Sequence, residues 1–408
     1  MFNFAEIINV WFDMEQMEML LRFVKSHASD DLNRLLLSAS RYPDVDIPFV
    51  VDQLKARRQI KDKLPSWYQN YRLLFPAKIA AEQCSSEQTA LYKQSLVSQN
   101  DHLCDLTGGL GIDSFFFSRK VRRVSYMERF AAYCEAAVSN FKVLGADNID
   151  VLNGDSAELL DQVGAVDVFY IDPARRGEGN KRVFALCDCE PDLTTLAPVL
   201  LTRAPRLIAK ISPMADIHHT LEVLPNVVAV HVLAVKNECK ELLFVMEQGA
   251  VVEDPLIRCV NYGSSGEPEI FDFSLGEERK ADVVPCGVVG RFLYEPNASI
   301  LKAGAFRSVA SRWNIDKLHV SSHLYTSEKK VPNFPGRSFV VEEVMSFSGK
   351  LCKTLSRSIP KANITVRNFP LSVEELRKRT KIADGGDVYL FATTLEGGEK
   401  VLIKAGKG

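Results

Sequence analysis

The sequence lacks a hydrophobic run that could cross a membrane. No apolar stretch in its 408 residues approaches the about 18–20 residues that a transmembrane helix requires. The N-terminal stretch carries acidic side chains among its apolar residues and has no basic leader, which does not fit a signal peptide. We therefore expect a cytoplasmic protein that does not attach to a membrane.

The nine cysteines also form no recognisable framework. Only Cys187 and Cys189 lie close together, and no second pair or histidine stands at zinc-binding spacing, so we expect no metal site. Reduced thiols in a cytosolic protein are the simplest interpretation. The sequence contains no internal repeat and no low-complexity tract.

The sequence has little net charge, −2 at pH 7, but that charge is unevenly distributed. Residues 301–408 contain 19 Lys and Arg against 10 Asp and Glu, a balance of +9, so residues 1–300 balance to −11. A basic C-terminal quarter on an acidic body indicates a polyanionic partner that binds through this end. A solvated basic face without a partner explains the composition equally well.

Helices are expected before residue 100. Residues 1–80 space their apolar side chains three and four apart, as amphipathic helices do, and residues 81–98 continue this pattern. Ser85 or Ser86 is expected to cap the helix within 81–98, because acid and amide side chains follow in its first turn.

From residue 102 short apolar runs alternate with helical stretches, which predicts a parallel sheet with helices on both faces. The five strand-like runs are 102–106, 122–127, 149–152, 166–171 and 206–211. Two further runs, 227–233 and 240–246, are joined by a short polar turn and must therefore pair antiparallel. We expect an α/β, Rossmann-like fold with one antiparallel strand inserted by a hairpin.

After residue 250 the sequence changes again. A linker rich in Gly, Ser and Pro is expected at 261–269, and residues 337–405 read as strand, helix, strand, helix, strand and strand. The predicted domains are a helical region at 1–80, a cofactor-binding α/β core at 81–249, a linker with a small α+β domain at 250–336, and a C-terminal α+β domain at 337–408.

The loop DLTGGLGID follows the first strand and opens a helix. Its glycines let the backbone turn sharply and approach a ligand, while the helix start presents free N–H groups. The nicotinamide pattern G-x-G-x-x-G fails at its third glycine, and the acid that opens the loop favours a cofactor with an ammonium group over a pyrophosphate. A structural turn remains an alternative. The cofactor-binding candidates here are Asp105, Thr107, Gly108, Gly109, Gly111 and Asp113.

Two further acids end the second and third strands. Glu128 lies 17 residues after Gly111, close to the spacing of an acid that binds ribose hydroxyls. Asp155 ends the third strand, where a carboxylate faces the amino group of an adenine. Their neighbours Arg129 and Ser156 are counted as cofactor-binding candidates with them. Each acid also fits a simpler role as the cap of the helix that follows.

The fourth strand ends in the motif D-P-A-R, in which Asp172, Pro173 and Arg175 are the catalytic candidates. Ligands of open α/β sheets bind at this carboxyl edge. A carboxylate here, counted also as a cofactor contact, accepts hydrogen bonds from a substrate amine and aims its lone pair at a transferred group. The expected phosphate-binding residues, or alternatively a charged loop, are Arg175, Arg176, Lys181 and Arg182.

These motifs in order (DLTGGLGID, the acid of MERF, NGD and YIDPARR) resemble those of class I S-adenosylmethionine (SAM) dependent methyltransferases. From about residue 60, QCSSEQTALYK, FLYEPNASILKAGAF and the stretch from GRSFVVEEV to ADGG resemble bacterial members with a ferredoxin-like insert and a C-terminal THUMP-like domain. The resemblance implies SAM as cofactor, a ferredoxin-like domain within 250–336, and RNA as substrate. A distant similarity to trimethylguanosine synthase implies that Gln83, Ser85 and Glu87 line the cofactor mouth.

The sequence departs from these families at two points. Amine-methylating relatives usually carry an aromatic residue after the proline motif, where this sequence has Arg175, so a base would stack on a guanidinium plane. Uracil-C5 methyltransferases share a D-P-P-R motif but need a cysteine at the end of the fifth strand, where Ser212 stands. A thiolate mechanism is therefore not expected, although Cys187 and Cys189 remain as alternatives.

The sequence thus predicts a methyltransferase that modifies a base in structured RNA (tRNA or rRNA) by direct in-line transfer to an amine. A methyltransferase acting on a protein or a small molecule, with the C-terminal domain as a docking module, is the alternative. A binding module that retains the fold without turnover is a third hypothesis. The pattern predicts no oligomeric state.

Overall fold

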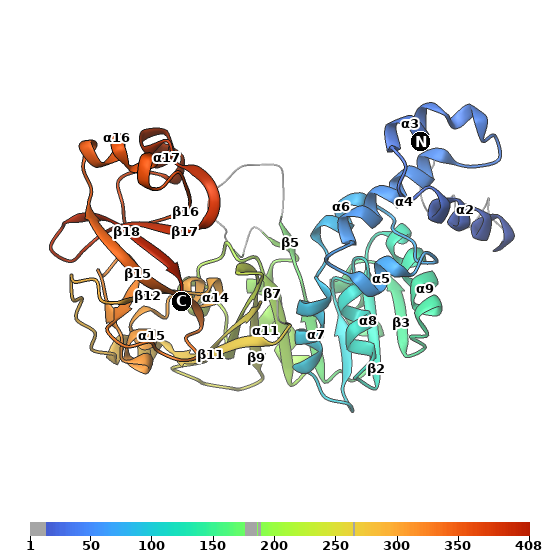
Figure 1. The fold of residues 1–408 in the computed structure, drawn as a ribbon. Helices are drawn as coiled ribbons and strands as arrows, with labels where there is room; N and C mark the ends of the chain where they lie inside the picture. The colour runs from blue at the N-terminus through green and yellow to red at the C-terminus, as the bar shows by residue number, and fades with distance from the viewer. Residues whose placement is uncertain (1–13, 176–185, 187–188, 264–265) are drawn as a thin grey trace. The chain divides into compact units, whose positions relative to one another are not determined.

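The computed structural model describes residues 14–175, 186, 189–263 and 266–408 (Figure 1). The chain divides into two compact units, each considered by itself. The first comprises residues 1–228 and 243–251, and the second residues 229–242 and 252–408. Among the described residues, no helix combines the length and the apolar character needed to span a bilayer.

The first unit begins with the predicted helices. Leu20 and Val24 of α2 pack with Val50 and Leu54 of α4 in a small core of their own. Ser86 caps α7, as one of the two predicted alternatives, by accepting a hydrogen bond from the Thr89 N–H at 3.2 Å. The helices are α2 (Met14–Ser26), α3 (Leu32–Leu37), α4 (Ile47–Ile60), α5 (Pro65–Gln69), α6 (Lys78–Gln83) and α7 (Glu87–Ser95), with a 3-10 turn, η1 (Ala39–Arg41).

A parallel sheet forms the centre of the first unit, as predicted. Its order is β9-β7-β4-β1-β2-β3, and the neighbouring pairs among β7, β4, β1, β2 and β3 run parallel. All five therefore end at one carboxyl edge, where ligands of such sheets bind. The strands are β1 (His102–Asp105), β2 (Arg123–Glu128), β3 (Ile149–Asn153), β4 (Val168–Ile171) and β7 (Arg206–Ile211).

Helices follow these strands and cover the sheet (Figure 1). The aromatic rings of Phe115, Phe116, Tyr126 and Phe141 pack in a core that joins α8 and α9 to β2. The helical segments are α8 (Ile112–Ser118), α9 (Ala131–Leu144), α10 (Ser156–Leu159), η2 (Leu160–Gln162), α11 (Leu193–Arg203) and α12 (Ile217–Val223). A short ribbon consists of β5 (Ala174–Arg175) and β6 (Cys189–Glu190).

A hairpin joins β8 (Val227–Val235) to β9 (Glu238–Glu247), and both strands contribute to both units. Its two turn residues, Lys236 and Asn237, have φ of +52° and +61°, the conformation that tight hairpins require. Such a turn makes these hydrogen-bonded neighbours antiparallel. The predicted Rossmann-like sheet with its inserted antiparallel strand is therefore confirmed.

The predicted linker at 261–269 is wrong in part. Its first residues end β10 (Leu256–Tyr262), and its last begin β11 (Pro268–Ser274), which pairs antiparallel with β10. The side chain of Asn261 donates a hydrogen bond to Glu269 across this pair at 3.0 Å. Gly263 and Gly266 thus lie between the two strands, and Pro268 begins the second of them. β10 also pairs parallel with β8 in the second unit.

The rest of the second unit contains a mixed sheet of order β13-β14-β12-β15-β18-β17-β16. The strand and helix order predicted for 337–405 is confirmed by β15, α16, β16, α17, β17 and β18. The elements are α13 (Leu275–Lys280), β12 (Phe292–Pro296), α14 (Ala298–Ala303), α15 (Phe306–Trp313), β13 (Asp316–Lys317), β14 (Tyr325–Ser327), β15 (Gly336–Ser346), α16 (Gly349–Ser358), β16 (Lys361–Arg367), α17 (Val373–Thr380), β17 (Ala383–Thr394) and β18 (Lys400–Lys407).

Candidate active site

The glycine loop lies between β1 and α8 and requires its glycines. Gly109 and Gly111 have φ of +54° and +76°, a region that residues with a side chain rarely adopt. A Cβ atom on Gly108 would lie 2.1 Å from the ring of Tyr126, so the backbone packs directly against that ring. The Tyr126 hydroxyl also donates a hydrogen bond to the Gly109 carbonyl at 2.6 Å. The loop is thereby held close to β2.

Asp105, at the end of β1, lies buried beneath this loop. Its carboxylate accepts hydrogen bonds from the Thr107 N–H at 3.0 Å and from the Ser114 hydroxyl at 2.6 Å. Burial raises the pKa of Asp105 to about 7, although these two hydrogen bonds favour the charged form and offset part of the increase. The loop is therefore anchored on a carboxylate that titrates near neutral pH.

Replacing Asp105 by Asn is expected to remove a pH dependence of folding. The unfolded chain loses this proton near pH 3.8, whereas the folded chain holds it to about pH 7. Stability from this group is greatest below about pH 4 and falls as the pH rises towards 7. At about pH 8 the free energy of unfolding of the variant should exceed that of the wild type by roughly 2 kcal/mol. The pKa shift sets an upper limit of about 4 kcal/mol, and the gain is smaller because an amide accepts weaker hydrogen bonds than a carboxylate.

Thermal unfolding of both proteins across this pH range checks the effect. A wild-type midpoint that rises between about pH 4 and 7 relative to that of the variant would contradict the assignment.

Asp113 lies at the start of α8 but is directed to other protein groups. Its carboxylate forms an ion pair of 2.8 Å with the fully buried Lys93 and accepts hydrogen bonds from Ser85 and Tyr170, each at 2.8 Å. Burial acts to raise the pKa of Asp113, but Lys93 and the nearby Lys210 together hold it below its ordinary value. Ser85, expected at the cofactor mouth, thus belongs to this buried cluster.

Glu87 and Gln83, the other two residues expected at the cofactor mouth, lie on α7 and α6. Glu87 accepts hydrogen bonds from the backbone and hydroxyl of Ser66, at 3.1 and 2.9 Å. Gln83 ends α6.

Glu128, at the end of β2, contacts the glycine loop. Its carboxylate accepts hydrogen bonds from the Gly109 N–H at 3.0 Å and from the Phe130 N–H at 2.9 Å. The second contact is with the N-cap residue of α9 and not with an N–H of its first turn, so the interpretation of Glu128 as the cap of this helix is wrong. Each carboxylate oxygen has a second lone pair, so the side chain can still accept hydrogen bonds from a ligand.

Asp155 follows β3 and caps α10, as one of its two interpretations predicted. Its carboxylate accepts a hydrogen bond from the Ala157 N–H at 2.9 Å, and the side chain is exposed. Ser156 begins the helix. The acid therefore stands at a helix start with unused acceptor capacity towards solvent.

Asp172 follows β4 directly and is held from two sides. Its backbone N–H donates a hydrogen bond to the Thr107 hydroxyl at 2.7 Å, which links the fourth strand to the glycine loop. Its carboxylate pairs with the ammonium group of Lys210, which comes from β7. Lys210 was not among the predicted site residues, because its only signal was a lysine inside the apolar run RLIAKI.

The residues after Asp172 are described in part. Pro173 precedes the ribbon in which Arg175 pairs with Cys189. Cys189 is buried, and Ser212 follows β7, so the end of the fifth strand carries a hydroxyl. The remaining predicted residues of this segment, which lie outside the described residues, are Arg176, Lys181, Arg182 and Cys187.

A cavity of about 140 Å³ lies at the carboxyl edge of the sheet. Three of the five predicted acids, Glu128, Asp155 and Asp172, line it together, whereas Asp105 and Asp113 do not. The lining residues are Leu106, Thr107, Met127, Glu128, Arg129, Phe130, Gly154, Asp155, Ser156, Asp172, Ala174, Glu190 and Pro191. The glycines of the loop lie outside this set and act by shaping the backbone around it.

Two cations offset part of the negative charge at the cavity. Arg129 forms an ion pair of 2.7 Å with Glu190, and Lys210 pairs with Asp172. Glu128 and Asp155 have no such partner among the described contacts and accept only backbone N–H groups. The cavity therefore presents carboxylates that suit hydroxyl, amino or ammonium donors of a ligand.

Family models match the C-terminal part of the chain. A ferredoxin-like domain matches residues 292–335, and a THUMP domain-like model matches residues 336–407.

Known proteins resemble the chain over different lengths. The crystal structure of a protein from Porphyromonas gingivalis W83, named as a methyltransferase, is 38% identical, covers 97% of this chain and 99% of that chain, and has a TM-score of 0.88. An uncharacterised S-adenosylmethionine-dependent methyltransferase from Mycobacterium tuberculosis is 23% identical over 59% of this chain and 64% of its own length. An uncharacterised RNA methyltransferase from Streptococcus pneumoniae is 25% identical over 34% of this chain and 32% of its own length. The chain thus spans less than two thirds of either curated relative.

Proposed function

Because this chain belongs to the methyltransferase family represented by the Porphyromonas gingivalis protein, and a curated relative is named as SAM-dependent, we propose that it uses SAM to methylate a base amine in structured RNA. The observation that carries the proposal is the cavity at the carboxyl edge of the sheet, where Glu128, Asp155 and Asp172 lie together. In open α/β sheets this edge is where ligands bind. The RNA is a tRNA or an rRNA in this proposal.

The chemistry of the cavity fits SAM. Glu128 would accept hydrogen bonds from the ribose hydroxyls, and Asp155 with Ser156 would accept one from the adenine amino group. Asp105, beneath the loop, would lie near the ammonium group of the methionine part of SAM. When bound, SAM supplies an electrophilic methyl group on a sulfonium centre.

The loop and the residue after Glu128 complete the proposed cofactor site. Gly108, Gly109 and Gly111 keep the backbone free of side chains, so that Thr107 and the loop backbone can approach the cofactor. Arg129, held by Glu190, would flank the nucleoside. Asp113 would contribute to this site indirectly, by anchoring the glycine loop.

Asp172 positions the acceptor in this proposal. Its carboxylate, held by Lys210, accepts hydrogen bonds from the exocyclic amine and directs the nitrogen lone pair to the methyl carbon. Held in line in this way, the nitrogen would accept the methyl group that bound SAM supplies and would release its proton to water. Pro173 stiffens the turn that fixes this geometry.

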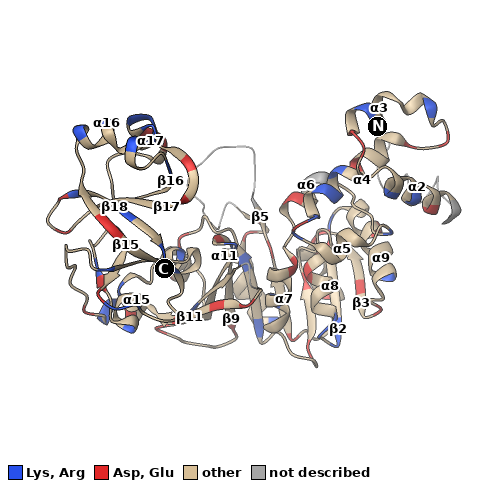
Figure 2. Ribbon diagram, viewed as in Figure 1, with Lys and Arg blue, Asp and Glu red and all other residues tan. Residues whose placement is uncertain are grey.

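RNA is the proposed substrate on three grounds. The C-terminal part matches a THUMP-like model, a partial relative is named as an RNA methyltransferase, and residues 301–408 have a balance of +9. Lys and Arg mark α16 and α17 in Figure 2, and the last turn of α17 carries Arg377, Lys378 and Arg379. We propose that this basic end and the loop with Arg175, Arg176, Lys181 and Arg182 contact phosphates.

The proposed domain organisation follows the same division as the motifs. It places a helical region at 1–80, the SAM-binding domain at 81–249, a linker and ferredoxin-like domain at 250–336, and a THUMP-like domain at 337–408.

Transfer of tritium from labelled SAM tests this function. The purified chain is incubated with total RNA and, separately, with total protein from cells that lack the gene, so that its target is unmodified. We expect label in RNA, and mass spectrometry of nucleosides then identifies the modified base. Label in protein alone would refute the RNA substrate, and SAM binding without transfer to either pool would indicate a binding module.

Replacing Glu128 by Ala is expected to weaken SAM binding at least about thirtyfold, because two hydrogen bonds to a charged acceptor are lost. Turnover at saturating SAM should change less than about tenfold, since the side chain contacts the cofactor rather than the reacting atoms. Calorimetry with S-adenosylhomocysteine measures the affinity. Glu128→Gln, which keeps one acceptor oxygen, is the matched control and should lose less. Unchanged affinity in both variants would exclude Glu128 from the site.

A further inference from the structure

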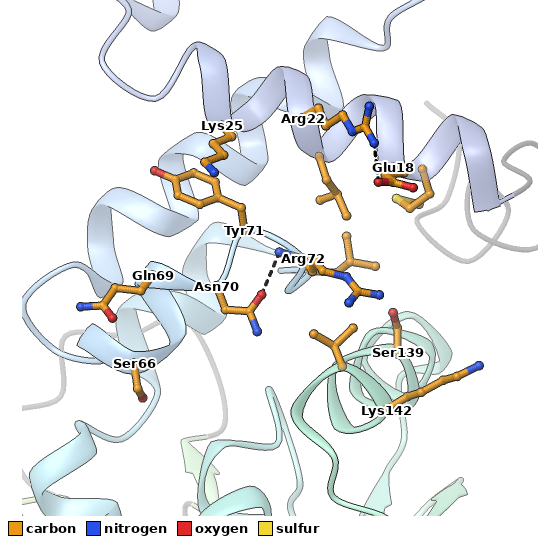
Figure 3. Close-up of a pocket in the computed structure, with 14 residues that line it drawn as sticks. Glu18, Arg22, Lys25, Ser66, Gln69, Asn70, Tyr71, Arg72, Ser139 and Lys142 are labelled. Carbon is orange, nitrogen blue, oxygen red and sulfur yellow. Dashed lines mark hydrogen bonds and ion pairs between the residues drawn. The ribbon is translucent and has the colours of Figure 1, made fainter.

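The first unit contains a second and much larger cavity. It is an open groove of about 1130 Å³ between α2, the loop that follows α5, and α9 (Figure 3). Its lining residues are Met17, Glu18, Leu21, Arg22, Lys25, Ser66, Gln69, Asn70, Tyr71, Arg72, Leu74, Ser139, Lys142 and Val143. None of them lines the cavity at the sheet edge.

The groove carries a surplus of positive charge. Four exposed cations, Arg22, Lys25, Arg72 and Lys142, line it together with one carboxylate, Glu18. Glu18 pairs with Arg22 at 2.7 Å, on a helix surface where such a pair contributes little. Because residues 1–300 carry a net charge of −11, this local reversal of sign is not a consequence of overall composition.

A buried arginine holds the loop that forms one wall. Arg57 of α4 is 2% exposed and donates hydrogen bonds to the carbonyls of Asn70, at 3.2 Å, and Leu73, at 2.8 Å. Its guanidinium lies 4.7 Å from the ring centre of Tyr71. The loop therefore presents Tyr71 and Arg72 from a fixed backbone, which limits the entropy that a ligand must remove.

A second buried contact ties this loop to α9. Asn140 accepts a hydrogen bond from the Leu74 N–H at 2.8 Å and donates one to the Leu74 carbonyl at 2.9 Å. Asn140 is buried and lies between the groove residues Ser139 and Lys142 on the same helix. Two walls of the groove, the loop and α9, are thus joined by buried hydrogen bonds.

We propose that this basic groove, defined by Arg22, Lys25, Arg72 and Lys142, binds the phosphate backbone of the RNA substrate. The inference rests on the proposed function and names a contact surface outside the C-terminal domain. Cations in an open groove suit a chain of phosphates, which Lys and Arg neutralise with release of counterions. The amides of Gln69 and Asn70 add donors for phosphate and ribose oxygens.

Fluorescence anisotropy of the full chain with a fluorescein-labelled oligouridylate tests the groove. Each lost phosphate contact lowers affinity about fivefold at about 0.1 M salt, from a salt exponent of about 0.7 per contact on single strands. Arg72→Gln/Lys142→Gln should therefore bind about 25-fold more weakly, with a salt slope smaller by about 1.4. The matched control is Arg119→Gln/Arg122→Gln, which removes two exposed arginines outside the groove and should bind like wild type.

The two proposals fail separately. Oligouridylate binding and KM for RNA that remain unchanged in the groove variant would overturn the groove assignment, whereas label transfer into RNA would still support the proposed function. A wild-type chain that labels protein and no RNA would overturn the proposed function. If the variant loses binding to polyglutamate and keeps binding to RNA, the groove belongs to an acidic polypeptide and the inference is wrong. Calorimetry with S-adenosylhomocysteine should give wild-type affinity in every variant, which shows that the first unit is folded.

Discussion

Replacing Asp172 by Ala is expected to reduce methyl transfer at least about a thousandfold while SAM affinity stays within about tenfold. Positioning of two reacting groups supplies about 7–11 kcal/mol of a barrier, and a thousandfold loss corresponds to about 4 kcal/mol, which is less than this full contribution. The carboxylate lines the cavity beside Thr107, and its proposed contact is with the acceptor amine. Loss of a contact that is made with the substrate in the transition state should lower kcat and leave cofactor binding unchanged.

The surroundings of Asp172 determine which controls are informative. Its backbone N–H bond to Thr107 does not involve the carboxylate, so the link between β4 and the glycine loop should survive substitution. Removal of the carboxylate leaves Lys210 without this partner, and Asp172→Asn and Lys210→Gln separate the two effects. Single-turnover transfer to RNA gives the rate, and calorimetry with S-adenosylhomocysteine gives the affinity. Wild-type rates in both Asp172 variants would disprove the assignment.

The fold was accessible from the sequence because its signals are local. Strand-length apolar runs alternated with helical spacing from residue 102, and a two-residue turn, Lys236 and Asn237, forced an antiparallel pair. The prediction of a linker at 261–269 was wrong in part because Gly, Ser and Pro are as common in a short connection between two strands as in a linker. The pairing of β10 with β11 depends on alternating burial on each side of it, a weaker signal than composition.

The site was accessible only in part. The glycine loop and the acids at strand ends predicted which segments meet, since parallel strands share a carboxyl edge. Residue type did not reveal which way each side chain points. Asp105 and Asp113 open and close the same loop, yet one lies beneath it and the other pairs with Lys93.

The missed partners are long-range pairs without a sequence pattern. Lys210 stands 38 residues after Asp172, and Lys93 stands 20 residues before Asp113. Each lysine lies in a segment read as an ordinary helix or strand, where a single charge is usually a solvated side chain. Only the packing of α7 against α8, and of β7 against β4, brings these charges to their acids.

Replacing Lys93 by Met is expected to destabilise the region around the glycine loop by about 3–5 kcal/mol, because it leaves a buried carboxylate without its cation. Lys93 is fully buried and Asp113 is 11% exposed, so water cannot take the place of the ammonium group. Hydrogen exchange followed by mass spectrometry reports α7 and α8 directly, and their protection should fall at least about hundredfold. Lys55→Met, which breaks an exposed pair with Asp52, is the matched control and should change protection little.

The double variant Lys93→Met/Asp113→Asn distinguishes two roles for Asp113. The amide can still accept the hydrogen bonds of Ser85 and Tyr170 but carries no charge, so at least half of the lost stability should return. If Asp113 serves only to anchor α8 and the loop, SAM affinity should return together with the protection of α8. If Asp113 contacts the cofactor itself, protection should return while affinity stays low. The ion pair of 2.8 Å with Lys93 and the position of Asp113 outside the cavity lining favour the first result.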